Sequence, residues 1–233
     1  MVPAYNEAAR LPLTLPKLAR FCKGHGSVEL LIVNDGSDDD TAGVVERFAS
    51  EHPFARLLEN PGNRGKGYSV RHGMQQAQGD WILSTDADLS SPIEEVDKLM
   101  TAIQREQAAA AIGSRALDRS LVGVHQAAFR EWSGRVFNLV MRTATGLPFR
   151  DTQCGFKLFR KDVAAAIFPR QRLEGFGFDV EDLLIARIHG YKVVEVPVRW
   201  DNVEGTKVSA LTGARAFCDL AIVRWNQLRG RYR

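Results

Sequence analysis

The chain has 233 residues, of which 45% are hydrophobic and 25% charged, and this apolar content is enough for one substantial core and too high for a disordered chain. The formal net charge of +3 does not by itself indicate a nucleic-acid binder. Three irregularly spaced cysteines do not indicate a disulfide framework. The sequence has no apolar run of about 18 residues, so no membrane-spanning helix is predicted. We expect a protein of a reducing compartment, made without a signal peptide.

The first half of the chain alternates short apolar runs with helical patterns. Strands alternating with amphipathic helices predict an α/β fold with a doubly wound, mostly parallel sheet, whose ligands bind beyond the carboxyl ends of the strands. Polar motifs follow two of these runs at that position. The predicted strands are Val28–Val33, Ala55–Leu58, Trp81–Ser84 and Ala108–Ile112, and the predicted helices are Thr41–Ser50 and Pro92–Glu106.

The second half has a different pattern. A long amphipathic stretch runs from Val122 to Thr145, and Asp151–Phe159 is expected to be irregular. A helix over Phe178–Ile188, a strand over Val193–Trp200 and a C-terminal helix over Ala210–Leu228 follow. The C-terminal helix sets apolar side chains and a Trp against arginines, a design suited to a membrane interface, although its apolar face could equally pack on the core.

The charge is distributed unevenly along the chain. Residues 1–112 hold 11 basic and 16 acidic residues, whereas residues 113–172 hold 11 basic and four acidic ones. Residues 173–198 carry a net charge of −3, and residues 199–233 carry +4. Two interpretations stay open: an anionic partner meets the second half, or the basic residues line solvated helix faces.

A glycine-rich loop, Gly62–Gly67, precedes a predicted helix over Tyr68–Gln78. The loop fails both the P-loop pattern, because no Ser or Thr follows Gly-Lys, and the dinucleotide pattern, because its third Gly is replaced by Val70. Its backbone N–H groups, with Arg64 and Lys66, could still face a phosphate at the helix N-terminus. The alternative is an ordinary loop without a ligand.

The strongest local signal is Asp86-Ala87-Asp88, which directly follows a predicted buried strand. Two carboxylates in such a position repel each other unless a cation offsets their charge. Oxygen ligands select Mg²⁺ or Mn²⁺, which commonly keep waters and bridge to substrate phosphates. We therefore expect Asp86 and Asp88 to bind a divalent metal.

Three motifs in combination carry a family resemblance: Val2–Glu7, Asn34–Thr41 and Asp86–Asp88. Through them the chain resembles the inverting family-2 glycosyltransferases of GT-A fold, over nearly its whole length. Within that family it is most similar to the dolichyl-phosphate β-glucosyltransferases and other polyprenyl-phosphate hexosyltransferases. The motifs for this closer similarity are Asn63–Gly67, Gly113–Arg115, Arg150–Phe159, Phe178–Glu181 and Val198–Lys207.

The resemblance implies transfer of a hexose, glucose from UDP-glucose, to the phosphate of a polyisoprenol with inversion. The acceptor phosphate is already anionic, so no general base is needed and catalysis is positioning and electrostatics. Asp179 and Glu181 are accordingly interpreted as orienting groups. The implied site residues are Pro3, Tyr5, Glu7 and Asp35 for the nucleoside, Asp86 and Asp88 for the metal, Arg115 and Arg130 for the acceptor phosphate, Lys207 near one of the phosphates, and Lys66, Gln153 and Glu181 as further substrate-binding residues.

The chain departs from the family pattern in four places. Only two residues precede Pro3, so the central strand is expected to be almost absent. Asn34 replaces the commoner first Asp of its turn, and Ser90 receives no metal role. The sequence to Arg233 shows no transmembrane tail, so we expect membrane contact through the amphipathic segments.

These features predict a single GT-A domain, with a nucleotide-sugar half (1–112), an acceptor half (113–207) and a basic amphipathic helix (208–233). We expect a cytoplasmic protein bound peripherally to the cytoplasmic face of an anionic membrane. Three alternatives remain: a GDP-mannose-dependent mannosyltransferase, a family member with a saccharide acceptor, and a nucleotide-sugar-binding protein without turnover. The acidic first half argues against a nucleic-acid binder.

Overall fold

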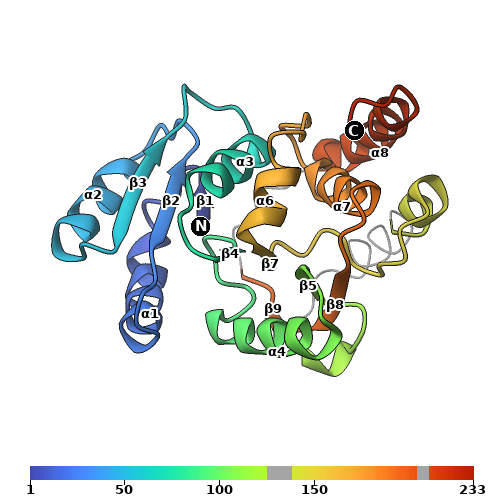
Figure 1. Cartoon of the computed structure of the whole chain (residues 1–233). Coiled ribbons are helices and arrows are strands. Elements are labelled where there is room, and N and C mark those ends of the chain that lie inside the picture. Colours follow the sequence, from blue (N-terminus) through green and yellow to red (C-terminus); the bar gives the residue numbers. More distant parts are fainter. Residues whose placement is uncertain (125–137, 204–209) are drawn as a thin grey trace.

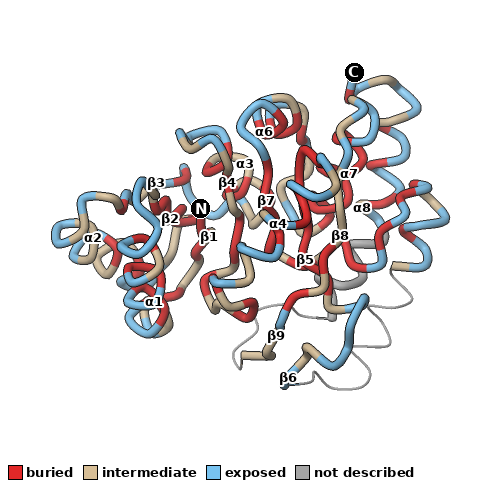
Figure 2. The backbone as a smooth tube through the Cα atoms, turned by 60° about the horizontal axis from the view of Figure 1, so that its bottom comes forward, coloured by how far each residue is buried: buried red, intermediate tan, exposed pale blue. Residues whose placement is uncertain are grey.

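The computed structural model describes residues 1–124, 138–203 and 210–233. Its strands form two sheets (Figure 1) and a small two-stranded ribbon, whose strands are labelled in Figure 2. The first sheet is parallel, in the order β1-β2-β3, and the second is mixed, in the order β4-β7-β5-β8, with β7 antiparallel to β4 and β5. The strands are β1 (Val2–Ala4), β2 (Leu30–Asn34), β3 (Ala55–Glu59), β4 (Trp81–Ser84), β5 (Ala110–Ser114), β7 (Lys157–Arg160) and β8 (Val193–Pro197), with β6 (Val122–Val124) and β9 (Trp200–Asp201) in the ribbon.

The short strand β1 lies between the two sheets and joins them. On one side it pairs with β2 over all three of its residues. On the other side, the Met1 nitrogen donates to the Leu83 carbonyl at 2.6 Å, and the Thr85 N–H donates to the Met1 carbonyl at 3.1 Å. The central strand is as short as expected, but its three residues are enough to connect the neighbouring strands.

Helices cover both faces of the layer that the two sheets form together, as Figure 1 shows. Side chains of a strand alternate between its faces, so Leu31 and Val33 of β2 enter one core while Leu30 and Ile32 enter the other. Figure 2 shows the buried strands between helices whose outer sides are exposed. The first core includes α3 (Lys66–Gln76), α6 (Lys161–Ile167), α7 (Phe178–Ile188) and α8 (Ala210–Leu228), and the second includes α1 (Leu11–Gly24), α2 (Thr41–Glu51) and α4 (Val96–Glu106).

The predicted elements agree best with the structure where the apolar pattern was clear. The bounds of β4, α7 and α8 are those expected, and β2 and β5 begin two residues later than predicted. The expectation for Asp151–Phe159 was wrong in its last part, since β7 begins at Lys157. The long pattern expected over 122–145 begins with strand β6 and ends in a helix over 138–145, and residues 125–137 lie outside the described part of the chain.

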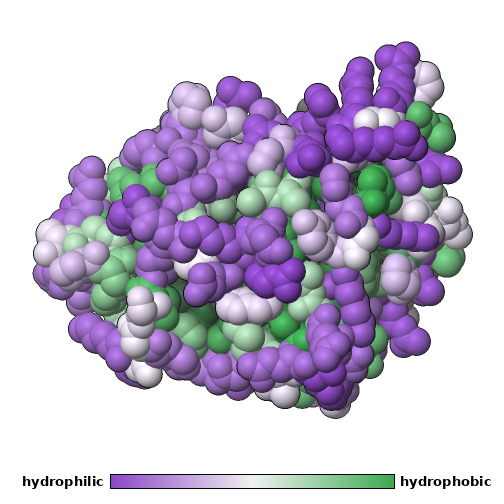
Figure 3. Space-filling model, viewed as in Figure 1, coloured by the Kyte–Doolittle hydropathy of each residue, from purple (hydrophilic) through white to green (hydrophobic). Residues whose placement is uncertain are grey.

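The C-terminal helix α8 has one packed side and one open side. Leu220 and Val223 are buried, whereas Ile222, Trp225 and Leu228 are 45%, 54% and 67% exposed. Figure 3 shows strongly hydrophilic side chains beside hydrophobic ones near the C-terminus. Within the described residues, none of the helices has the length and apolar character to cross a bilayer.

Candidate active site

The candidate site lies at one edge of the sheet, where several strands end. β1, β2, β4 and β5 run in the same direction, so their carboxyl ends meet at this edge. The residues that directly follow them are Tyr5, Asp35, Thr85 and Arg115, with Asp86 one position further. The fold thus brings together four of the motifs singled out in the sequence.

Asp35 is nearly buried, with 4% of its surface exposed, and its carboxylate fixes the glycine-rich loop. Its Oδ1 accepts from the Asn60 side-chain amide at 2.8 Å and from the Arg64 N–H at 3.0 Å, and its Oδ2 accepts from the Gly65 N–H at 2.8 Å. A carboxylate has about four acceptor positions, so room for a further donor remains. The predicted contact between Asp35 and the nucleoside base stays a prediction.

The turn after β2 shows why asparagine fits at position 34. The Asn34 side-chain amide donates to Glu59 Oε2 at 2.9 Å, while its Oδ1 accepts from the Ser37 N–H at 3.2 Å and from the Ser37 hydroxyl at 2.5 Å. An aspartate here would have no donor for Glu59 and would repel it. The departure from the family pattern is therefore compensated by Glu59.

The N-terminal motif residues lie beside that turn. Pro3 is part of β1, and the Tyr5 hydroxyl lies 3.5 Å from Asp38 Oδ2, at the outer limit of a hydrogen bond. Glu7 is buried and forms an ion pair with Arg10 at 2.8 Å. These residues line the start of the edge, and their roles toward a nucleoside remain predictions.

The glycine-rich loop does not present its backbone to an anion in this structure. The N–H groups of Gly67 and Tyr68 donate to the Glu174 carbonyl at 2.8 and 3.3 Å, and those of Arg64 and Gly65 donate to Asp35. The Arg64 guanidinium forms an ion pair with Glu174 at 2.9 Å. The expectation of a phosphate cradle built from these groups is therefore wrong, because protein acceptors already occupy them.

Lys66, by contrast, points to the acidic turn. Its ammonium lies 2.6 Å from Asp86 Oδ1, and the two side chains are 23% and 36% exposed. Burial raises the pKa of Asp86, but the charge of Lys66 and its hydrogen bond lower it by more. The pKa of Asp86 therefore lies below the usual range. Asp86 is therefore ionised at neutral pH.

The acidic turn is tightly built. Asp88 Oδ1 accepts from the Ser90 N–H at 2.8 Å, and Leu89 adopts a left-handed conformation with φ of 48°, which is uncommon for a leucine. The backbone of Gly155 packs directly on Asp86, since a Cβ there would lie 2.3 Å from Oδ2. Strain and close packing of this kind concentrate at functional sites.

The two aspartates fit a divalent metal. They supply carboxylate oxygens of the type that Mg²⁺ and Mn²⁺ prefer, and the Lys66 ammonium shows that this position attracts a cation. Within the part of the chain that the structure describes, there is no group of three or more His, Cys, Asp or Glu side chains that could hold a metal. A metal held by two carboxylates takes its other ligands from water and substrate.

Arg115 is held in a bidentate ion pair. Its Nε and Nη2 donate to the two oxygens of Asp151 at 2.7 and 2.9 Å, and its own backbone N–H donates to Asp151 at 3.1 Å. The guanidinium also lies 5.4 Å from the centre of the Trp200 ring. Burial raises the pKa of Asp151, but Arg115 outweighs this and holds it below the usual range.

No role was predicted for Lys157 from the sequence. Lys157 is the one basic residue in the buried part of β7. Its ammonium donates to the Cys154 carbonyl at 2.6 Å and forms a short ion pair with Asp179, and both side chains are 5% exposed. Burial raises the pKa of Asp179 despite this partner. A lysine inside the apolar run Phe156–Phe159 was the available signal, because an isolated buried charge needs a partner.

The remaining predicted residues differ in their surroundings. Glu181 is fully buried and accepts from the backbone N–H groups of Arg172 and Leu173 at 2.9 and 2.7 Å, so its carboxylate binds protein rather than facing the acidic turn. The Gln153 N–H donates to Asp151 Oδ1 at 3.2 Å. Arg130 and Lys207 lie outside the described residues.

Comparison with known proteins agrees with this arrangement. Residues 1–168 match glycosyl transferase family 2. The chain is 36% identical over 220 residues to the dolichyl-phosphate beta-glucosyltransferase ALG5C of Trichomonas vaginalis, covering 89% of this chain and 65% of the relative. It is 34% identical over 252 residues to the dolichyl-phosphate beta-glucosyltransferase of Saccharomyces cerevisiae, covering 100% of this chain and 75% of that protein.

Solved structures share the fold at lower identity. Glucosyl-3-phosphoglycerate synthase from Mycobacterium tuberculosis in complex with UDP matches 96% of this chain and 78% of its own, with a TM-score of 0.69 and 18% identity. Its complex with Mn²⁺, UDP-glucose and glycerol 3-phosphate matches 96% of this chain and 78% of its own, with a TM-score of 0.68 and 17% identity. The chain has the GT-A fold and belongs to glycosyl transferase family 2.

Proposed function

We propose that this chain transfers glucose from UDP-glucose to dolichyl phosphate or a related polyprenyl phosphate, with inversion at the sugar. The observation that carries the proposal is the cluster of Asp86, Asp88 and Lys66 at the carboxyl edge of the sheet, with Arg115 close enough to lower the pKa of Asp86. The names of relatives that are about a third identical to this chain support the sugar and the acceptor. The chain spans 65% to 75% of the length of these relatives.

Asp86 and Asp88 would hold a divalent ion, which supplies charge neutralisation on the diphosphate of the leaving nucleotide when it is bound. The chain's own residues position the reactants. Asp35, with Pro3, Tyr5 and Glu7, binds the nucleoside. Lys66 neutralises negative charge next to Asp86 of the acidic turn. Gln153, whose N–H donates to Asp151 Oδ1, is a further substrate-binding residue.

Arg115 binds the acceptor phosphate, together with Arg130 and Lys207 of the undescribed segments. The bidentate contact with Asp151 fixes the guanidinium plane, so it can meet the phosphate with little loss of side-chain entropy. No carboxylate is required as a base, because the acceptor oxygen is already anionic. In agreement with this, Asp179 is occupied by Lys157 and Glu181 by backbone donors.

The acceptor is a lipid, and the proposal includes peripheral contact with the cytoplasmic face of a membrane. The exposed side chains of Ile222, Trp225 and Leu228 on α8 support this contact, as does Arg229, whose guanidinium lies 4.5 Å from the centre of the Trp225 ring. Trp and Arg side chains are favoured at the boundary between headgroups and acyl chains. We expect co-sedimentation with anionic vesicles at low salt, and equal sedimentation with neutral vesicles or at high salt would contradict it.

The deciding experiment supplies the purified chain with radiolabelled UDP-glucose, Mg²⁺ or Mn²⁺ and a short polyprenyl phosphate, and measures label in the organic phase. Label from UDP-glucose is the expected result. Label from GDP-mannose alone would identify a mannosyltransferase, and label only on an added saccharide would identify a different acceptor. Binding of UDP without any turnover would indicate a nucleotide-sugar-binding protein.

A further inference from the structure

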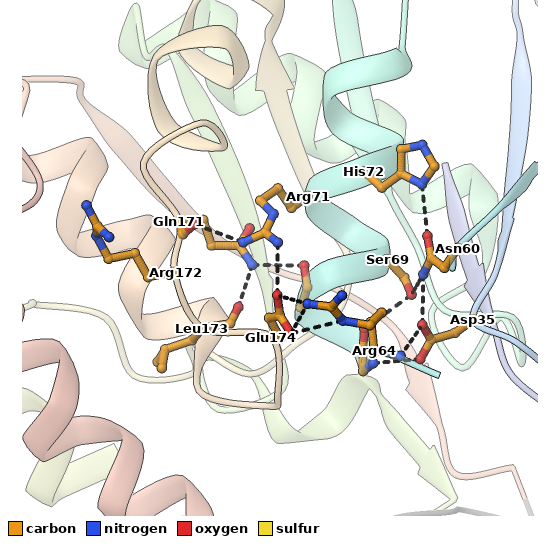
Figure 4. A network of polar contacts seen from close by, with 12 residues as sticks. Asp35, Asn60, Arg64, Ser69, Arg71, His72, Gln171, Arg172, Leu173 and Glu174 are labelled. Carbon is orange, nitrogen blue, oxygen red and sulfur yellow. Dashed lines mark hydrogen bonds and ion pairs between the residues drawn. The ribbon is translucent and has the colours of Figure 1, made fainter. Parts of the chain in front are cut away.

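The segment 171–175 lies in the connection between α6 and α7 and packs against the glycine-rich loop and the start of α3 (Figure 4). The Glu174 carbonyl accepts from the N–H groups of Gly67 and Tyr68 at 2.8 and 3.3 Å. The Gln171 side-chain amide donates to the Gly67 carbonyl at 2.8 Å. The loop and the segment are over 100 residues apart in the sequence and are joined here by direct backbone contacts.

The Glu174 side chain adds ion pairs with two arginines to these contacts. Its carboxylate accepts from Arg64 Nη2 at 2.9 and 3.1 Å and from Arg71 Nη2 at 3.2 Å. Both guanidiniums lie within 5 Å of the centre of the Tyr68 ring, at 4.8 and 4.9 Å. Isolated exposed ion pairs contribute little, but a carboxylate shared by two arginines in a network fixes a geometry.

The close approach requires glycine in the loop. Gly65 has a φ of 104°, and a Cβ there would lie 2.5 Å from the Glu174 carbonyl oxygen. A Cβ at Gly67 would lie 2.7 Å from the Leu173 carbonyl oxygen and 2.9 Å from that of Gly175. The loop and segment 171–175 therefore fit each other in one specific arrangement.

Segment 171–175 is fixed from its other side by the core. The fully buried carboxylate of Glu181 accepts from the N–H groups of Arg172 and Leu173 and from the Tyr232 hydroxyl at 2.6 Å. Gln171 is 3% exposed, and its amide also donates to the Leu173 carbonyl at 2.8 Å. The segment thus forms a rigid support rather than a loose loop.

The glycine-rich loop makes the contacts with both Asp35 and Asp86, the two carboxylates proposed to act on the donor. The Arg64 and Gly65 N–H groups bind Asp35, and the Lys66 ammonium binds Asp86. A shift of the loop would change both contacts at once. The loop therefore transmits any displacement of Glu174 to the acidic turn and to Asp35.

We infer that Glu174 is a positioning residue for the donor: it holds the glycine-rich loop so that Asp35 and Lys66 are in place before the nucleotide sugar binds. The inference rests on the proposed function for the roles of Asp35 and Lys66. Glu174 contacts neither of these side chains in the interactions described, and it acts through Arg64, Arg71 and the loop backbone.

Glu174→Gln tests the inference, because it keeps the shape of the side chain and removes the charge that both arginines share. The matched control is Asp162→Asn, which removes the Arg160 ion pair of 2.6 Å on the exposed start of α6. For Glu174→Gln we expect faster amide hydrogen exchange over residues 62–70, UDP binding weakened about tenfold, and a raised KM for UDP-glucose with an unchanged acceptor KM. Asp162→Asn should leave all three at the wild-type values.

A general loss of folding would lower kcat and Tm but would not raise one KM selectively, so the donor–acceptor split separates positioning from stability. Unchanged exchange and unchanged UDP affinity in Glu174→Gln, or equal changes in Asp162→Asn, would overturn the inference. If the wild-type chain does not bind UDP, the proposed function fails, and the exchange of residues 62–70 alone then decides whether Glu174 holds the loop.

Gly67→Ala provides a second variant that leaves every charge in place. Its Cβ would push against the carbonyls of Leu173 and Gly175, whereas the control Gly24→Ala, at the end of α1, meets nothing within 4 Å. We expect Gly67→Ala to raise exchange over residues 62–70 and the KM for UDP-glucose, as Glu174→Gln does. Wild-type exchange in Gly67→Ala would contradict the close fit on which the inference depends.

Discussion

Asp86 of the acidic turn and the carboxylates of helix α7 lie near each other, but their pKa values are shifted in opposite directions. Asp86 is partly exposed, and Lys66 holds its pKa below the usual range. Asp179, Glu181 and Asp182 on α7 are at most 4% exposed, and burial raises the pKa of each. A carboxylate that is available to a cation therefore lies at the exposed edge of the sheet, while the carboxylates behind it stabilise the scaffold.

The difference follows from the partners of each group. A strand end at the sheet edge leaves a side chain open to solvent and ligand on one side, as it does for Asp86. The first turn of α7 instead faces the core, where Asp179 meets Lys157 and Glu181 meets backbone N–H groups. Asp182 Oδ1 has no hydrogen-bond partner among the residues that the structure describes. Substitutions at the acidic turn should therefore affect activity, and substitutions in the first turn of α7 should affect stability.

The largest effect is expected from Asp88→Asn at the acidic turn. Loss of one of two carboxylates removes the charge that the proposed metal needs, so we expect kcat/KM to fall by about 100-fold or more, with little change in Tm. Radiolabel transfer to polyprenyl phosphate measures this. The control Asp80→Asn changes an exposed carboxylate at the other end of β4, and full activity of Asp88→Asn would refute the metal role.

Arg115→Met is expected to lower stability as well as activity. It leaves Asp151, with 3% of its side chain exposed, as a buried charge without its ionic partner, and such a loss destabilises by about 3 kcal/mol. Because the pKa of Asp151 is lowered in the folded protein, this contribution is present above about pH 4 and disappears as the pH falls through the folded value. Urea unfolding at several pH values measures it, and a pH-independent loss would contradict the assignment.

The sequence allowed the acidic turn to be predicted because its signals are local. A buried run followed by two aspartates, and an Asp-Gly-Ser turn after another run, place Asp86 and Asp35 at strand ends without knowledge of the fold. Parallel strand ends share one edge, which explains why these residues meet.

Other parts of the site depend on pairings that no local pattern contains. β7 is antiparallel between β4 and β5, which sets Lys157 opposite Ser84, and Lys157 there meets Asp179 of α7 while Gly155 packs on Asp86. The glycine-rich loop was expected to face an anion, since nothing in its own sequence reveals that Glu174 caps the same N–H groups.

Asp182→Asn should change stability in the opposite pH direction from Arg115→Met. Burial raises the pKa of Asp182, and Glu181 and Asp179 raise it further, so the carboxyl is protonated in both folded and unfolded states below about pH 4. As the pH rises above about 4, the unfolded chain releases this proton while the folded chain keeps it, so the wild type loses stability until the pH has passed the folded value. We expect the variant to gain about 1 to 3 kcal/mol relative to wild type between pH 4.5 and 8. An equal stability difference at both pH values would show that the charge is not the cause.

The smallest effect is expected from His72→Phe, behind the contact between Asn60 and Asp35. His72 Nδ1 lies 2.8 Å from Asn60 Oδ1, which fixes the amide so that its NH₂ group donates to Asp35 and to Ser69. The opposite amide orientation would point an oxygen at the Asp35 carboxylate, so the histidine sets the direction of this contact. Phenylalanine keeps the ring and removes the partner of Asn60.

For His72→Phe we expect UDP binding to weaken about fivefold, the usual effect of one lost hydrogen bond, with the acceptor KM unchanged. Isothermal titration with UDP measures it. His52→Phe is the control, since His52 follows α2 and stacks on Phe54 away from Asp35. Equal affinities of His72→Phe and wild type would mean that Asn60 keeps its orientation without the histidine, and the two backbone N–H donors of the loop would then suffice to hold Asp35.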